Sequence, residues 1–181
     1  GAYIVTEKSC EGYVIDDTQR MIQLDANENA QFVFTNSIKP ALRIIKTSSD
    51  GTPLKGVTFR IARIEDGTHY LDRTTNEQGE ILLSDLEPGV YSVQETATDA
   101  AHILDLREYH VALFPGKTST LVIENQKRPN LIVYKHDADT GEPIPDTVFE
   151  VRAADGHSVD EIKTDSEGRA ELRNLLPCVY E

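Results

Sequence analysis

Residues 42–46 read LRIIK and residues 131–135 read LIVYK, two apolar runs that each end in a lysine, 89 residues apart. Similar segments recur at this spacing along the whole chain. The further pairs, at offsets of 88 or 89 residues, are 1–7 with 89–95, 33–36 with 122–125, Pro40 with Pro129, and 75–79 with 164–168. A period of this length is typical of one small β-sandwich domain per repeat.

The phase of the repeat divides the 181 residues into one whole copy and two partial ones. Residues 40–128 make a complete unit. Residues 1–39 resemble only the second half of a unit, and residues 129–181 resemble only a first half. We therefore expect a segment of a longer array, with both ends of the sequence lying inside domains.

Each copy has the short apolar and β-branched runs of an all-β protein. Turn segments rich in Gly, Pro, Asn and Asp separate these runs. No stretch keeps a 3.6-residue apolar period long enough for a helix. Seven short strands at nearly regular spacing predict a β-sandwich. In the central copy they are expected near residues 42–47, 57–64, 68–74, 80–86, 90–97, 107–114 and 119–126, with turns at 49–53, 65–67, 76–79, 87–89 and 115–117.

Composition and charge argue against several classes of function. The chain carries 18 Lys and Arg against 31 Asp and Glu, a formal net charge of −13. A surface this negative repels phosphate backbones, so no nucleic-acid partner is expected. No apolar run approaches the roughly 20 residues that span a bilayer, so we expect no membrane insertion of this segment. The sequence shows no signal segment or sorting motif.

Metal, cofactor and thiol chemistry are not expected either. The five histidines show no paired ligand spacing. Cys10 and Cys178 lie in different copies, and we expect free thiols. The stretch from Asp137 to Gly141 resembles the start of a calcium loop, but the later Gly and Glu of such a loop do not follow at the right spacing. We interpret it as a polar turn.

A lysine, a glutamate and an asparagine each continue an apolar strand face, because side chains alternate between faces along a strand. Lys135, Glu7 and Asn36 repeat the pattern in the flanking copies. Burial of Lys and Glu is costly unless they are paired, and the alternative is a strand end whose polar tip reaches water. Recurrence at the same repeat positions favours burial. The in-phase sets of the central copy are Leu42, Ile44 and Lys46; Tyr91, Val93 and Glu95; and Leu121, Ile123 and Asn125.

The order of the motifs in the central copy resembles a known family. The motifs are LRIIK at 42–46, DGTPL at 50–54, GVTF at 56–59, Gly79, LEPGVY at 86–91 before Glu95, and VIEN at 122–125. This order resembles the Cna B-type, or SpaA-like, repeats of Gram-positive surface adhesins and pilins. The departures are Asp146 in the place of Gly56, Cys178 in the place of Gly89, and AAHI at 100–103 where the first copy has Gly12 and Tyr13.

The resemblance implies tandem immunoglobulin-like sandwiches of the reverse, prealbumin-like type, locked by intramolecular isopeptide bonds. Carried over to this sequence, Lys46 would be the nucleophile, Asn125 the electrophile and Glu95 the catalytic proton shuttle. Burial favours a neutral amine on Lys46 and a protonated Glu95, which donates to and polarises the Asn125 amide. Such a protein modifies itself once and is not an enzyme in the usual sense. The corresponding positions of the partial copies are Glu7, Asn36 and Lys135.

The resemblance further implies a structural stalk of an extracellular, cell-wall-anchored surface protein. Its partners would be neighbouring repeats of the same protein, with host extracellular matrix contacted through other domains. The alternative is an adhesin domain whose own loops bind host protein or glycan, and a third reading is an accessory domain of an enzyme. The partial copies each lack the groups that the other carries, so head-to-tail association between chains is a further hypothesis. An arbitrary cut through a longer product is its simpler alternative.

Overall fold

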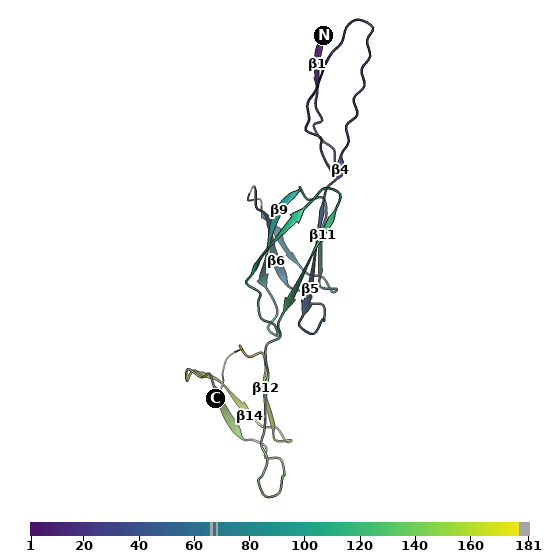
Figure 1. Ribbon diagram of the computed structural model, residues 1–181. Coiled ribbons are helices and arrows are strands. Elements are labelled where there is room, and N and C mark those ends of the chain that lie inside the picture. Colours follow the sequence, from purple (N-terminus) through teal and green to yellow (C-terminus); the bar gives the residue numbers. More distant parts are fainter. Residues whose placement is uncertain (66, 68, 178–181) are drawn as a thin grey trace. The chain divides into compact units, whose positions relative to one another are not determined.

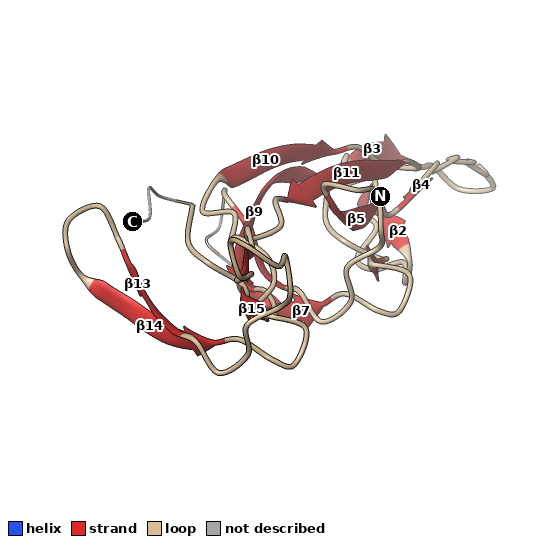
Figure 2. Ribbon diagram, turned by 90° about the horizontal axis from the view of Figure 1, so that it is seen from below, coloured by secondary structure: helices blue, strands red, loops and turns tan. Residues whose placement is uncertain are grey.

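The protein is described from a computed structural model that covers residues 1–65, 67 and 69–177, without the side chains of residues 69–71. Three expectations concern residues outside the described ones: a turn at Asp66, a strand start at Thr68 and a free thiol at Cys178. Within these limits the chain consists of strands and loops only (Figure 2). The described part accordingly has no helix that could cross a membrane.

The described residues form fifteen strands. They are β1 Ala2–Val5, β2 Tyr13–Val14, β3 Arg20–Gln23, β4 Ser37–Ile38, β5 Ala41–Ser48, β6 Thr58–Arg63, β7 His69–Thr74, β8 Glu80–Leu83, β9 Gly89–Ala97, β10 Glu108–Leu113, β11 Thr118–Asn125, β12 Leu131–Tyr134, β13 Val148–Arg152, β14 Ser158–Lys163 and β15 Arg169–Leu172.

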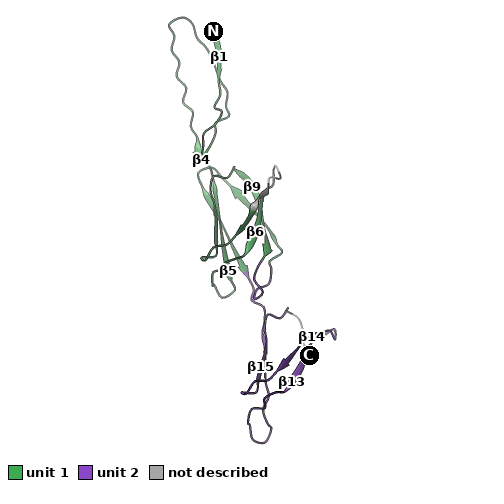
Figure 3. Cartoon of the chain, turned by 180° about the vertical axis from the view of Figure 1, so that it is seen from behind, with its two compact units in different colours: residues 1–97, 105–124 green, residues 98–104, 125–181 purple. Residues whose placement is uncertain are grey.

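The chain divides into two compact units, which consist of residues 1–97 with 105–124, and of residues 98–104 with 125–181 (Figure 3). This division passes through the central copy of the repeat and just before the last residue of β11. The boundaries of the two compact units therefore differ from the boundaries of the sequence repeat. The division into residues 1–39, 40–128 and 129–181 stays a prediction from the sequence.

The central copy contains two sheets, as expected for a β-sandwich (Figure 1). One sheet has the order β10-β9-β6-β7 and the other the order β11-β5-β8. The buried apolar core draws on both sheets, which is the arrangement that gives each sheet a covered face. Its members are Leu42, Ile44, Leu54, Val57, Phe59, Ile61, Ile81, Leu86, Tyr91, Val93, Leu113 and Ile123.

The seven expected strands are present, with shifted ends. The largest shift is at β8, which ends at Leu83 rather than near residue 86. Asp85 has a positive φ of 58°, a left-handed conformation that cannot continue a strand. The inward alternation along β9 runs from Tyr91 to Glu95, as expected, and does not continue to Ala97, which is exposed.

The repeat is visible in the backbone hydrogen bonds around the two lysines that end the apolar runs. Lys46 N–H donates to Gly79 O at 2.8 Å, and Leu54 N–H donates to Lys46 O at 2.9 Å. The corresponding bonds of the last copy join Lys135 N–H to Gly168 O at 2.7 Å and Ile144 N–H to Lys135 O at 2.9 Å. Each lysine is thus held by the same backbone contacts, 89 residues apart.

Glycine is required beside each lysine. Gly79 and Gly168 have φ of +70° and +68°, and a Cβ at either position would lie 2.4 Å from the carbonyl oxygen of Lys46 or Lys135. No side chain fits at that distance, so these glycines allow a turn to pack directly on the lysine-bearing strand.

The substitution of Gly56 by Asp146 leaves the loop conformation unchanged. Gly56 has φ of +76° and Asp146 has φ of +61°. The N–H of Gly56 donates to the carbonyl of Thr75 at 3.0 Å, and the N–H of Asp146 donates to the carbonyl of Thr164, the equivalent threonine of the last copy, at 2.9 Å. Aspartate tolerates the left-handed region better than most residues, which explains why this departure from the repeat is accommodated.

The flanking copies are built from two-stranded sheets. Residues 1–39 contain the antiparallel pairs β1–β3 and β2–β4. Residues 129–177 contain β12–β15 and β13–β14, which enclose a small cluster around Val151, Ile162 and Ala170. Several apolar side chains of the first copy are exposed, among them Ile4 and Met21.

We predict that Gly79→Ala destabilises the chain far more than Gly51→Ala. Both glycines have positive φ, but nothing lies within 4 Å of a Cβ at Gly51. Gly51→Ala should therefore cost only the conformational term, about 1–2 kcal/mol. Gly79→Ala should add a further ~2 kcal/mol or more, because the Lys46 carbonyl must move. Urea unfolding followed by circular dichroism measures both, and equal losses would refute the close-approach explanation.

Candidate cross-linking site

Lys46 and Glu95 form an ion pair inside the central sandwich. Lys46 lies near the end of β5 and Glu95 near the end of β9, so the two residues come from different sheets. Lys46 Nζ lies 3.2 Å from Glu95 Oε2, and their side chains are 0% and 1% exposed. The expectation that both residues face the core is confirmed, and the alternative of polar tips in water is wrong for them.

Burial lowers the pKa of the Lys46 ammonium below its ordinary value, because the charged form loses its hydration. The Glu95 charge and hydrogen bond oppose this shift, and the charge of Asp105 opposes it more weakly. The Arg107 charge acts in the same direction as burial. The net effect makes the neutral amine, which is the nucleophilic form, more accessible than on a solvated lysine.

Asn125 is the last residue of β11 and is 1% exposed. Its Nδ2 donates a hydrogen bond to Thr98 Oγ1 at 3.2 Å. The strand that Asn125 ends is the sheet neighbour of β5, the strand that carries Lys46. The amide is therefore buried as expected, and Thr98 contacts the nitrogen that would leave as ammonia.

The first copy brings Glu7 and Asn36 together. Asn36 Nδ2 donates to Glu7 Oε1 at 2.5 Å. The backbone N–H of Asp16 donates both to Glu7 Oε2 at 3.1 Å and to Asn36 Oδ1 at 3.2 Å. The residues predicted from the repeat thus share one hydrogen-bonded cluster, which is half-buried in this copy.

Lys135 is also half-buried, and it directly follows β12. Its backbone is held as that of Lys46 is, but no glutamate or asparagine of the Glu95 or Asn125 type belongs to the described part of its copy. Its role stays a prediction.

Sequence reasoning missed Thr98, Asp16 and Asp105. Asp105 gives a signal that was available, because it lies 89 residues after Asp16. Thr98 gives no such signal, because the segment between Glu95 and Asp105 is one residue longer than the segment between Glu7 and Asp16, which breaks the repeat spacing.

The segment that resembles a calcium loop is a turn stabilised by its own side chains. Asp137 Oδ1 accepts hydrogen bonds from the Asp139 N–H, the Thr140 N–H and the Thr140 hydroxyl at 2.9 to 3.0 Å, so its carboxylate serves the turn itself. The polar-turn interpretation is confirmed. The part of the chain that the structure describes contains no group of three His, Cys, Asp or Glu arranged to hold a metal ion.

The family model of the SpaA prealbumin-like fold domain matches residues 40–127 and 129–181. The chain belongs to this family. The expected resemblance and the all-β, prealbumin-like sandwich fold are both confirmed. No match was found among curated proteins.

Several solved structures are similar to this chain. The TIE protein of Bacillus anthracis is 26% identical with a TM-score of 0.50, over 86% of this chain and 29% of that one. A streptococcal ancillary pilin is 18% identical with a TM-score of 0.48, over 96% and 62%. BcpA, the major pilin subunit of Bacillus cereus, is 18% identical with a TM-score of 0.47, over 74% and 52%. The SpaA-family chain thus spans less than two thirds of each of these proteins.

We predict that Lys46 makes the stability of an uncross-linked chain depend on pH. In Asn125→Ala, which cannot form the expected bond, Lys46 keeps a pKa below the ~10.4 of an unfolded lysine. Between the two pKa values the unfolded chain binds one proton more than the folded chain. The free energy of unfolding should therefore rise with pH in this window, by up to about 1.4 kcal/mol per pH unit.

Urea unfolding of Asn125→Ala between neutral and mildly alkaline pH measures this slope. The matched control is Asn125→Ala with Lys46→Met, which removes the titrating group but keeps much of the side-chain volume. The control should be flatter over the same range. The same slope in both variants would show that Lys46 is not its source.

Proposed function

We propose that this chain is a stalk segment of an extracellular, cell-wall-anchored adhesin or pilin, whose central repeat is rigidified by a self-formed isopeptide bond. The observation that carries the proposal is the Lys46–Glu95 pair, fully buried in the sandwich beside the strand that ends in Asn125. Burying a lysine and a glutamate costs free energy, and covalent capture of the amine removes the charge that makes burial costly.

The proposed reaction joins Lys46 Nζ to the side-chain carbonyl carbon of Asn125. The lone pair of the neutral amine attacks this carbon, and the carbonyl π electrons move to Oδ1. Glu95 accepts the proton lost from Nζ and delivers a proton to Nδ2. The carbonyl re-forms as the carbon–nitrogen bond breaks, and one ammonia leaves. Glu95 ends in its initial state, and the chain reacts once without turning over.

The fold supplies the two conditions that this reaction needs. Lys46 and Glu95 are held within 3.2 Å, so proton transfer requires no encounter. The lowered pKa of Lys46 supplies the neutral amine. Thr98 Oγ1 accepts a hydrogen bond from Asn125 Nδ2 and so orients the amide, with the leaving nitrogen toward the hydroxyl.

The proposed bond closes a loop from residue 46 to residue 125. On the loop-entropy description used for disulfides, a closed loop of this length stabilises the folded state by about 4–5 kcal/mol. An amide also resists reducing agents, which suits a chain with two cysteines in different copies. We propose no cofactor and no enzymatic turnover.

Membership of the SpaA prealbumin-like family supports the structural role. The proposed partners are other pilin subunits and neighbouring repeats of the same protein. The loops of the central copy are short, the longest connection running from Ala97 to Glu108 between β9 and β10, which favours a spacer over a loop-based adhesin. Specific binding of this chain to a host matrix protein or glycan would favour the adhesin alternative.

We predict that the intact mass of the folded chain is lower than its sequence mass by one ammonia. Lys46→Ala removes the nucleophile and Glu95→Ala removes the proton shuttle, so each variant should keep its full sequence mass. High-resolution mass spectrometry after denaturation makes the measurement. The full mass in a well-folded wild-type chain would contradict the proposed bond.

We also predict that the bond dominates the thermal stability of the central copy. Lys46→Ala should lower the melting temperature by many degrees, because a loss of about 4–5 kcal/mol is large for a unit of this size. Differential scanning calorimetry with and without a reducing agent tests this, and the reductant should have no effect on the wild type. Lys46→Met separates loss of the bond from loss of packing. Wild-type melting in both variants would show that no stabilising bond exists.

A further inference from the structure

An aspartate near the Glu7–Asn36 pair of the first copy contacts both of these side chains through its backbone N–H. Asp16 N–H is shared between Glu7 Oε2 at 3.1 Å and Asn36 Oδ1 at 3.2 Å. Asn36 Oδ1 is the oxygen on which negative charge develops when an amine attacks the amide. In a copy that also contains the lysine, a backbone N–H that faces this atom would act as an oxyanion donor.

The side chain of Asp16 holds its own turn in place. Asp16 Oδ1 accepts from the N–H of Thr18 at 3.1 Å, and Asp16 Oδ2 accepts from Arg20 Nη2 at 2.7 Å. These bonds, those from Thr18 first, lower the pKa of the Asp16 carboxyl. The carboxylate therefore stays charged. Its bonds to Thr18 and Arg20, two and four residues later, hold the turn in one conformation and so set the direction of the Asp16 N–H.

Asp105 repeats this arrangement in the central copy, 89 residues later. Its Oδ1 accepts from the Arg107 N–H at 3.0 Å and from Arg107 Nε at 2.9 Å. Its Oδ2 accepts from Arg107 Nη2 at 2.8 Å and from the Tyr109 hydroxyl at 2.7 Å. The partners are again two and four residues ahead, although their side chains differ from those of Thr18 and Arg20.

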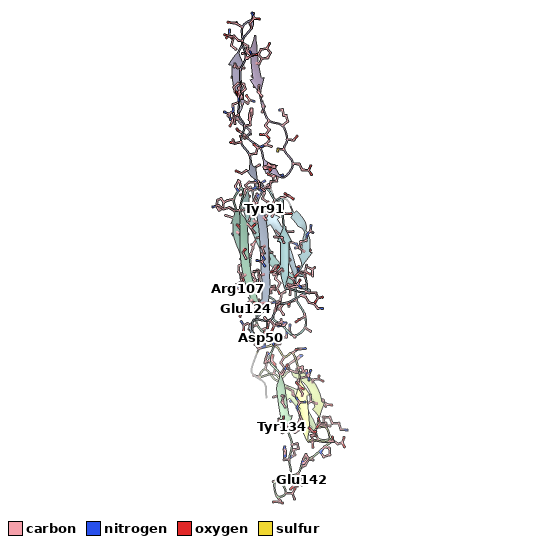
Figure 4. All side chains as sticks on the ribbon, turned by 90° about the vertical axis from the view of Figure 1, so that its right-hand side faces the viewer. Asp50, Tyr91, Arg107, Glu124, Tyr134 and Glu142 are labelled. Carbon is pink, nitrogen blue, oxygen red and sulfur yellow. The ribbon has the colours of Figure 1, made fainter. Side chains whose placement is uncertain are left out.

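The central aspartate is more enclosed than its counterpart, since the Asp105 side chain is only 8% exposed whereas that of Asp16 is 17% exposed. The Arg107 hydrogen bond holds the pKa of the Asp105 carboxyl well below its usual range. The chain just before Asp105 runs beside the end of β11, because the N–H of Ile103 donates to the carbonyl of Gln126, the residue after Asn125, at 2.9 Å. Figure 4 shows Arg107 and Glu124, the residue before Asn125, toward the same end of the central copy, with Tyr91 toward the other.

We propose that the turn held by the Asp105 carboxylate directs the Asp105 N–H at the Asn125 carbonyl, as Asp16 does for Asn36, and so accelerates isopeptide formation. The carboxylate is a positioning group, and the backbone N–H is the group that meets the reacting oxygen. This inference rests on the proposed function and adds a third component to the Lys–Glu–Asn set.

The role follows from what Glu95 cannot do alone. Glu95 must take a proton from Nζ and give one to Nδ2, so it is not available throughout the step as a donor to the oxyanion on Oδ1. A backbone N–H stays in place and does not titrate. Loss of one such donor typically slows a reaction by about 100- to 1000-fold. A partly misdirected donor should cost less than that, but at least about tenfold.

The experiment follows bond formation in the full chain. Protein is recovered unfolded in denaturant from inclusion bodies, refolded by dilution, and quenched in acid at set times, and ammonia loss is read by intact mass. Asp105→Ala should fold but lose ammonia at least tenfold more slowly than wild type. Asp105→Asn should recover most of the rate, because an amide oxygen still accepts from the Arg107 N–H. Tyr109→Phe removes a single bond to the carboxylate and should give an intermediate rate.

Two controls separate positioning from general stability. Asp155→Ala removes a carboxylate that makes the same kind of bond, Asp155 Oδ1 to the His157 N–H at 3.0 Å, in the β13–β14 turn, and should react at the wild-type rate. Asp105→Ala is also combined with Lys46→Met, so that its effect on melting is measured in a chain without any bond. The positioning role requires that the rate fall while this melting temperature changes little.

The outcomes distinguish the inference from the function on which it rests. A wild-type chain that never loses ammonia rejects the isopeptide bond and this inference together. A bonded wild type with Asp105→Ala at the wild-type rate rejects the inference alone. Equal slowing in Asp105→Ala and Asp105→Asn would also overturn it, because the charge rather than the turn would then be responsible. If Asp105→Ala does not fold, Tyr109→Phe and Asp105→Asn decide. The inference is rejected if Tyr109→Phe loses ammonia at the wild-type rate while Asp105→Asn is slowed.

Discussion

The buried ion pair of Lys46 and Glu95 is the interaction on which the rest of the central repeat depends. An ammonium ion in such a place loses hydration worth several kcal/mol, and a single carboxylate at 3.2 Å offsets only part of this loss. Ile44 and Val93 precede the two residues on the same strand faces and belong to the apolar core, and apolar surroundings raise the cost of burying the charges. The surroundings thus favour any process that removes the charge on Lys46.

The alternation of side chains along the strands predicts that Lys46, Glu95 and Asn125 are buried in the sandwich, and all three are. A strand has a period of two, so one apolar neighbour in phase determines the face of the next residue. The recurrence of the three residue types made the prediction stronger than any single strand allowed. The same reasoning located Glu7 and Asn36, which the first copy joins by a hydrogen bond.

Side-chain alternation predicts which residues are buried only within strands, and the residues that the sequence did not predict lie in loops. Thr98 and Asp105 follow β9 in a connection whose path depends on hydrogen bonds between turn atoms and side chains. Their positions cannot be read from the hydrophobic pattern, because each is a single polar residue in a connection that has no strand period. The early end of β8 has a similar origin, since Asp85 adopts a left-handed backbone conformation that the sequence from Leu83 to Leu86 does not reveal. Where a loop did repeat, as at Gly56 and Asp146, the backbone conformation was kept although the residue changed.

The adjacency of β5 and β11 has a mechanical consequence. β5 is the first strand of the central copy and β11 its last, and they are neighbours in one sheet. In the proposed bonded state, tension that enters at Pro40 passes along β5 to residue 46, crosses to residue 125 and leaves the repeat. Residues 47–124 lie outside this path and carry no tensile load. Their loops and outer faces are therefore free to diverge in sequence, or to acquire insertions, without weakening the proposed stalk.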